Sequence, residues 1–252
     1  MSLLEVTDLS VQFGGVKAVQ DVSFAVDEGE VFSIVGPNGA GKTTIFNLIS
    51  RIYDTTSGEI RFADQDITRL PTHRVAELGI ARTFQNTELF ERETVLNNLL
   101  IGCHIHRRSN VFSDLLFLPG VRKQELALRR EVEDIIDLLD LQAYREQSIG
   151  SLSYGVRKMV EIARALCLKP KMILLDEPSS GLNPEETEDL SFWLEDINDG
   201  LKITVIMVEH DMNLVSQASD RVMALADGRL LTVGSPQEVQ SHPEVLRAYL
   251  GD

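Results

Sequence analysis

The residue types and spacing of one short segment, residues 36–44, suit the binding of a polyphosphate. In order, it contains Gly36, Pro37, Asn38, Gly39, Ala40, Gly41, Lys42, Thr43 and Thr44. This order matches the phosphate-loop pattern G-x-x-x-x-G-K-[ST], in which backbone N–H groups wrap the phosphates and glycine permits their close approach. Lys42 is expected to neutralise the β- and γ-phosphates, and the Thr43 hydroxyl to hold Mg2+. The alternative is a glycine-rich turn without a ligand.

A second segment ends in two acids. The apolar run Met172–Leu175 is followed by Asp176 and Glu177. A buried strand of this kind delivers its carboxylates to the sheet edge where ligands of open α/β sheets bind. Asp176 is expected to support Mg2+ through water, and Glu177 to polarise the attacking water as a general base. Taken alone, the run is a strand that ends in two acids, but the phosphate loop favours the functional interpretation.

Three short apolar runs must position these residues. Val31–Val35 directly precedes the phosphate loop, and Met172–Leu175 and Ile203–Val208 come late in the chain. Strands buried on both faces have this composition, and their alternation with helices predicts a parallel sheet covered by helices. A helix is expected to begin at about Lys42, so that its positive dipole end faces the phosphates.

Other segments predict strands, turns and helix starts. The first 35 residues are strand-like, with apolar residues alternating with polar ones over Val22–Val26. Residues 222–233 have the pattern of a hairpin with a tight turn at Asp227-Gly228. Asn183-Pro184 and Ser235-Pro236 each have a capping residue followed by proline, which predicts helix starts.

The middle of the chain, from about residue 88 to 164, lacks strand-like runs. Leu128, Val132, Ile136 and Leu139 follow helical spacing, which predicts a helical insertion. Within it, His104–Arg122 mixes basic and apolar residues. This segment is interpreted either as a helix-and-loop excursion or as a contact surface for a partner.

Composition excludes several classes of protein. The chain has 252 residues, with 24 Lys and Arg against 39 Asp and Glu, which gives a formal net charge of −15. Such a charge disfavours broad binding of nucleic acid. No apolar run approaches the ~18 residues of a membrane span, and the first residues do not form a secretory signal. Cys103 and Cys167 are expected to be buried thiols in a reducing compartment.

The order of the motifs resembles that of ABC-type ATPases over essentially the whole chain. Thr83-Phe84-Gln85 follows the phosphate loop, and Leu152-Ser153-Tyr154-Gly155 has the L-S-x-G form about twenty residues before the acid-terminated strand. The resemblance implies an α/β P-loop NTPase core with a mixed sheet, an N-terminal antiparallel β-subdomain and an inserted helical subdomain. Residues 1–252 are expected to form one ABC domain, with the core at about 1–87 and 165–252 and the helical subdomain at about 88–164.

The resemblance implies further roles for single residues. Gln85 corresponds to the glutamine that contacts Mg2+ and the attacking water, and is therefore expected to be catalytic and metal-binding. His210, after the strand ending at Val208, corresponds to the switch histidine that holds the γ-phosphate, and Phe13 to the aromatic residue that stacks on adenine. A single strand Phe is also a common core residue, so Phe13 has that second interpretation.

Ser153 and Gly155 correspond to the signature motif, which completes the γ-phosphate site of the opposite subunit. The common signature is L-S-G-G-Q, and this chain has Tyr154 and Val156 in place of the first Gly and the Gln. The segment Ser179–Asn183 corresponds to the D-loop, which runs along the dimer interface in the family. The D-loop often ends in Asp, where this chain has Asn183.

Several short segments of the sequence resemble those of the branched-chain amino acid uptake family, some of whose members import urea, amides or aromatic acids. The similar segments are Phe13–Val19, Gly79–Asn86, Thr94–Leu100, Gly181–Pro184 and Ala248–Gly251. The resemblance implies an ATPase that uses ATP and Mg2+ to energise an importer of branched-chain amino acids or related small solutes.

Its expected partners are a second ATPase subunit, integral membrane permease subunits and, indirectly, a solute-binding protein, with no nucleic acid. It is expected at the cytoplasmic face of the cell membrane as a peripheral subunit. Two alternatives remain: a soluble ABC ATPase of iron–sulfur assembly, and the ATPase of lipopolysaccharide export.

Overall fold

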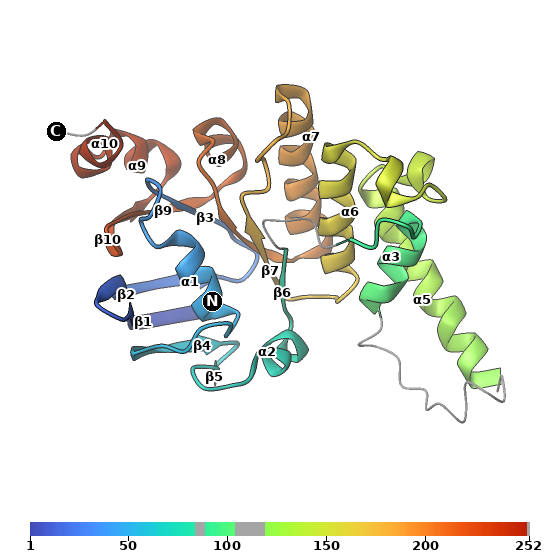
Figure 1. The fold of residues 1–252 in the computed structure, drawn as a ribbon, viewed down its shortest axis with the longest axis horizontal. Coiled ribbons are helices and arrows are strands. Elements are labelled where there is room, and N and C mark those ends of the chain that lie inside the picture. Colours follow the sequence, from blue (N-terminus) through green and yellow to red (C-terminus); the bar gives the residue numbers. More distant parts are fainter. Residues whose placement is uncertain (84–88, 104–118, 251–252) are drawn as a thin grey trace. The chain divides into compact units, whose positions relative to one another are not determined.

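The computed structural model describes residues 1–83, 89–103 and 119–250 (Figure 1). The chain divides into two compact units, one formed by residues 1–85 and 171–252 and the other by residues 86–170. In the described part of the chain, no helix is both long and apolar enough to cross a bilayer.

A six-stranded sheet lies at the centre of the first unit. Its strand order is β10-β9-β3-β8-β7-β6. The strands are β3 (Val31–Val35), β6 (Ile80–Arg82), β7 (Met172–Asp176), β8 (Thr204–Val208), β9 (Arg221–Ala226) and β10 (Arg229–Gly234). All neighbours are parallel except β9 and β10, which form the predicted hairpin. Every residue of β3, β7 and β8 is buried, as their continuous apolar runs predicted.

A second, antiparallel sheet is formed by residues near the N-terminus. Its order is β2-β1-β4-β5, with β1 (Ser2–Phe13), β2 (Val16–Asp27), β4 (Ser57–Phe62) and β5 (Gln65–Asp66). The mixed and antiparallel sheets confirm the predicted α/β class. The sequence did not predict β4 or β6, because β4 buries only Ile60 and Phe62 and β6 has three residues.

The first unit also contains the helices α1 (Lys42–Ile49), α2 (Thr72–Leu78), α7 (Pro184–Glu195), α8 (Met212–Ala218), α9 (Pro236–Ser241) and α10 (Pro243–Leu250). A π-helical turn, η4 (Asp196–Gly200), follows α7. One hydrophobic cluster contains Leu4 and Ile60 of the antiparallel sheet, Phe32 and Ile34 of β3, and Phe46 of α1. The cluster thus packs the helix that follows the phosphate loop between the two sheets.

The second unit is mainly helical, as predicted. It contains α3 (Val95–Gly102), α5 (Pro119–Leu138), α6 (Tyr154–Leu166) and the 3-10 turns η2 (Gln142–Tyr144) and η3 (Ile149–Ser151). Val132, Ile136 and Leu139 are buried, in agreement with the helical spacing. Most of the 104–122 segment, residues 104–118, lies outside the described residues.

Both cysteines are free thiols, and both are buried as expected. Cys103 and Cys167 are far apart in the sequence, but their side chains share a hydrogen bond, which the sequence did not predict. This bond lowers the pKa of Cys103, and together with burial it raises the pKa of Cys167.

We predict that Asn183→Ala lowers the free energy of unfolding by about 0.5–2 kcal/mol. The Asn183 side chain accepts from the Glu186 backbone N–H at 3.0 Å, and the Glu186 carboxylate accepts from the Asn183 N–H at 2.9 Å. Asn183→Asp keeps the acceptor and adds a negative charge at a helix N-terminus, so it should match or exceed the stability of the parent. Urea denaturation measures both variants, and equal destabilisation by Ala and Asp would contradict the capping role.

Candidate nucleotide-binding and hydrolysis site

The sheet brings the predicted motifs of the first unit to one edge. Strands β3 and β7 both pair in parallel with β8, so the three carboxyl ends lie side by side. The phosphate loop follows β3, Glu177 follows β7, and His210 follows β8 by two residues. Backbone hydrogen bonds extend this pairing beyond the strands, from Glu177 N to Val208 O at 2.9 Å and from Glu209 N to Ile34 O at 3.2 Å.

The phosphate loop has a backbone that only glycine can adopt at two positions. Gly36 has φ 152°, and a Cβ there would lie 2.2 Å from the backbone oxygen of Leu225. Gly41 has φ 100°, and a Cβ there would lie 2.6 Å from the backbone oxygen of Ala18. Gly41 is also the N-cap of α1, which has neither a side-chain cap nor an acid in its first turn. The N-terminus of α1 therefore suits an anion.

Lys42 places a buried positive charge at this loop. Its ammonium donates to Gly36 O at 2.6 Å and to Pro37 O at 3.0 Å. Burial lowers the pKa of Lys42, while the carboxylates of Glu177 and Asp176 act in the opposite direction. The lysine of the loop and the two acids after β7 therefore interact electrostatically.

Asp176 is buried and forms an ion pair with Arg82, a residue that the sequence reasoning missed. Arg82 Nη2 lies 3.0 Å from Asp176 Oδ2, and both side chains are less than a tenth exposed. Nη1 of the same guanidinium donates to Asn47 Oδ1 at 2.7 Å and to Ser50 Oγ at 2.9 Å. Arg82 thus links the end of β7 to α1, the helix that begins at Lys42. The sequence did offer a signal for this residue, since Arg82 is a basic residue that follows the apolar Ile80 and Ala81 shortly before Gln85.

Burial lowers the pKa of Arg82, and the carboxylate of Asp176 opposes that shift. The guanidinium carbon also lies 5.6 Å from the centre of the Phe46 ring, within the range of a cation–π contact.

Glu177 has a left-handed backbone, with φ 50°. A non-glycine residue in this region carries strain of about 1–3 kcal/mol, which persists only where the surroundings hold it. Its N–H donates to Val208 O, and its carbonyl accepts from Ser180 N at 3.1 Å. The side chain is half-buried at the same edge as Lys42.

His210 presents its side chain to solvent, with 58% of it exposed. Its backbone N–H donates to Glu209 Oε2 at 3.0 Å, and its Nδ1 lies 3.9 Å from the same oxygen. Glu209 itself is fully buried. The sequence reasoning did not single out Glu209, although a charged residue between a buried strand and a candidate histidine was a signal.

Phe13 lies on the surface, so its interpretation as a core residue is wrong. It is 45% exposed, and its ring contacts that of Tyr53 edge-on, with the ring centres 5.0 Å apart. Its proposed contact with adenine stays a prediction. Gln85 lies outside the described residues.

In the second unit, Ser153 and Gly155 lie at the start of α6. The Ser153 hydroxyl caps the helix by accepting from Val156 N at 3.4 Å, and Gly155 is buried. Arg157 fixes the preceding turn, donating from Nε to Leu152 O at 3.0 Å and from Nη2 to Gly150 O at 3.2 Å. This geometry forms although Tyr154 and Val156 replace the common signature residues.

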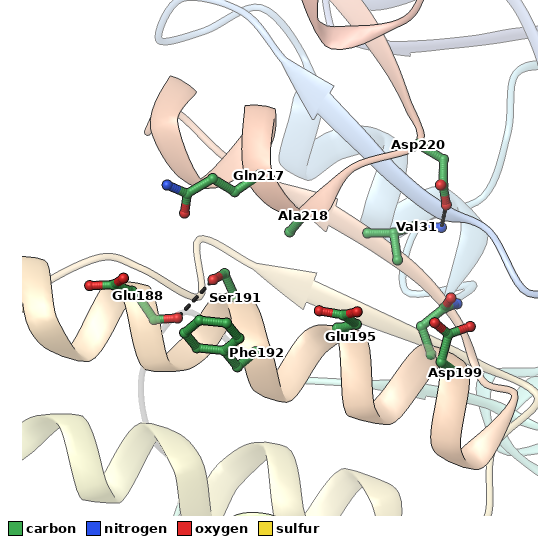
Figure 2. A pocket seen from close by; sticks show the side chains of 10 residues that line it. Val31, Glu188, Ser191, Phe192, Glu195, Asp199, Gln217, Ala218 and Asp220 are labelled. Carbon is green, nitrogen blue, oxygen red and sulfur yellow. Dashed lines mark hydrogen bonds between the residues drawn. The ribbon is translucent and has the colours of Figure 1, made fainter.

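A separate hollow of about 410 Å3 lies between α7 and α8 (Figure 2). Four of its lining residues are acids, Glu188, Glu195, Asp199 and Asp220. Like charges at this hollow disfavour a polyphosphate. Among the residues that the structure describes, none from the predicted motifs lines it, so the nucleotide is expected at the phosphate loop.

The residues at the sheet edge fit both ATP and Mg2+. The loop packs so closely against the rest of the chain that a Cβ at Gly36 or Gly41 would collide with the backbone of Leu225 or Ala18. The Thr43 hydroxyl and the Asp176 carboxylate are oxygen ligands of the kind that Mg2+ prefers. Together, the parallel sheet, the loop and the acids define a P-loop nucleotide-binding protein.

Comparison with known proteins narrows this class. Residues 19–180 match the family model described as ABC transporter, and residues 229–252 match the model described as branched-chain amino acid ATP-binding cassette transporter. The chain is 39% identical over 250 residues to the high-affinity branched-chain amino acid transport ATP-binding protein BraF of Pseudomonas aeruginosa, covering 99% of this chain and 98% of BraF. It is 37% identical, with the same coverage, to the corresponding protein LivG of Escherichia coli.

Solved structures agree with these sequence comparisons. A nucleotide-free ATP-binding cassette from an ABC transporter has a TM-score of 0.87 and 32% identity, with both chains fully covered. The ADP conformation of MJ1267, an ATP-binding cassette of an ABC transporter, gives the same values. The chain therefore belongs to the family of ABC transporter ATP-binding proteins, and it is an ATPase of that type.

We predict that Arg82→Met lowers the free energy of unfolding by about 3–5 kcal/mol, because it removes one charge of a buried ion pair. Arg61 is the matched control, since its ion pair with Glu59 is nearly half exposed. Arg61→Met should change stability by less than about 1 kcal/mol. Urea denaturation compares the two, and equal small effects would contradict the bracing role of Arg82.

Proposed function

We propose that the chain is the ATP-hydrolysing subunit of an ABC importer for branched-chain amino acids or related small solutes. The main support is that this chain is 37–39% identical to two proteins named for branched-chain amino acid transport, over 98% of their length. The match of residues 229–252 to a model of the same description supports it independently, because this stretch lies outside the general ABC transporter match.

In this proposal the residues at the sheet edge bind and hydrolyse ATP. The amides of the phosphate loop and the ammonium of Lys42 bind the β- and γ-phosphates. Thr43, Asp176 and Gln85 would hold Mg2+, which would supply positive charge to the phosphate oxygens. Glu177 orients the attacking water and accepts its proton, and His210 binds the γ-phosphate.

A second ATPase subunit completes each site in this proposal. Ser153 and Gly155 bind the γ-phosphate held by the opposite subunit. A serine hydroxyl and a glycine amide at a helix N-terminus are suitable donors to an anion. The capped start of α6 and its bracing by Arg157 support this role, because they fix the donors before the nucleotide arrives.

Membrane permease subunits dock on residues 89–94 in this proposal. Asn98 is fully buried and fixes this segment: its Oδ1 accepts from Phe90 N at 2.9 Å, and its Nδ2 donates to Phe90 O at 3.1 Å and Thr94 O at 3.0 Å. The held segment presents Phe90, which is 53% exposed. A rigid backbone with an exposed aromatic side chain is typical of an interface anchor. Docking there would place the chain at the cytoplasmic face of the membrane.

We predict that Glu177→Gln slows ATP hydrolysis by at least ~100-fold, because it removes the general base, while ATP still binds. Size-exclusion chromatography with ATP should then show a stable dimer. Glu5→Gln is the control, an exposed strand residue expected to keep the parent rate. Hydrolysis by Glu177→Gln at the parent rate would overturn the role of Glu177.

We predict that Phe90→Asp reduces co-purification with the permease subunits from detergent-solubilised membranes by at least about tenfold, because it removes one interface anchor. The ATPase rate of the isolated chain should stay within about twofold of the parent, since Phe90 is outside the sheet edge. Phe192→Asp is the matched control, because Phe192 is similarly exposed at 57%. If both variants co-purify equally, the permease does not dock at residues 89–94.

A further inference from the structure

A carboxylate that the proposed mechanism does not use is buried between the two loops that carry Glu177 and His210. Glu209 directly follows β8 and is 0% exposed to solvent. Three backbone N–H groups donate to its two oxygens. A fully buried carboxylate needs such donors, and hydrogen bonds to an ionised acceptor are stronger than neutral ones.

One oxygen of Glu209 holds the loop after β7. Ser179 N donates to Oε1 at 2.8 Å. Ser179 lies two residues beyond Glu177, inside the turn that the hydrogen bond from Ser180 N to Glu177 O closes. This turn contains the left-handed backbone of Glu177, with φ 50°. Glu209 therefore supplies part of the restraint that a strained conformation requires.

The other oxygen holds the loop after β8. His210 N donates to Oε2 at 3.0 Å, and Asp211 N donates to the same oxygen at 3.3 Å. The first bond fixes the backbone of His210, whose ring is otherwise exposed to solvent. A single side chain thus spans the loop of the general base and the loop of the γ-phosphate ligand.

We propose that Glu209 is a positioning residue for ATP hydrolysis, which ties the loop of Glu177 to the loop of His210 through its two carboxylate oxygens. The proposal rests on the function proposed above, because it assigns Glu209 an effect on those two residues. It touches neither nucleotide nor water in this role. A misplacement of about 1 Å in such a group is enough to cost about 100-fold in rate.

Glu209→Gln tests the proposal directly. The amide has nearly the same shape but keeps one acceptor oxygen and presents an NH2 group to the other loop. We expect kcat for ATP to fall about 10- to 100-fold, with KM and the affinity for ATP within about twofold of the parent. Glu209→Asp, which keeps the charge but is too short to span both loops, should lower kcat in the same way. It serves as the second variant if the first does not fold.

Glu30→Gln is the matched control. Glu30 is also a buried carboxylate of this unit that accepts from a backbone N–H, that of Asp27 at 2.7 Å, but it precedes β3 at the opposite edge of the sheet. We expect this variant to keep the parent kcat even if its thermal midpoint falls. A loss of kcat in Glu30→Gln equal to that in Glu209→Gln would overturn the proposal, because the effect would then be general destabilisation.

A mutant cycle in a background that lacks both Glu177 and His210 separates the two proposals. If Glu209 acts through these two residues, adding Glu209→Gln to the Glu177→Gln/His210→Ala variant should change the residual rate by less than about twofold. A further full 10-fold loss, or a parent kcat in Glu209→Gln alone, would overturn the role of Glu209. A parent rate in Glu177→Gln would instead overturn the assignment of the general base.

Discussion

The parallel pairing of β3, β8 and β7 is the constraint on which the site depends. Each strand is buried along its whole length, and the register places Asp176 opposite Val208. A shift of one residue would turn buried side chains to the other face of the sheet and displace the loops. Because parallel strands end at the same edge, three segments far apart in the sequence present a loop, two acids and a histidine together.

Charge at this edge is balanced over short distances. The chain carries a net charge of −15, yet its phosphate loop offers amides, a helix N-terminus and Lys42 to an anion. Arg82 pairs with Asp176, and Lys42 interacts with both Asp176 and Glu177. The cations therefore reduce the repulsion that two acids would exert on a polyphosphate. In contrast, none of the described residues that line the acidic hollow between α7 and α8 is basic (Figure 2).

The sequence predicted the features that depend on local pattern. Buried strands before the loop and before Asp176, the helix starts at Asn183 and Ser235, and the hairpin at Asp227-Gly228 all follow from neighbouring residues. The contacts that hold the site were not predictable in this way. Arg82 meets Asp176 across 94 residues, and Glu209 meets Ser179 across 30. Such pairings arise from strand order, which a single sequence does not state.

The central claim, that the edge formed by β3, β8 and β7 binds and positions ATP, is tested most directly by a crystal structure of the Glu177→Gln variant with ATP and Mg2+. The phosphates are expected within residues 36–43, with the metal beside Thr43 and Asp176 and with His210 at the γ-phosphate. Phosphates bound elsewhere, or a metal remote from Asp176, would contradict it.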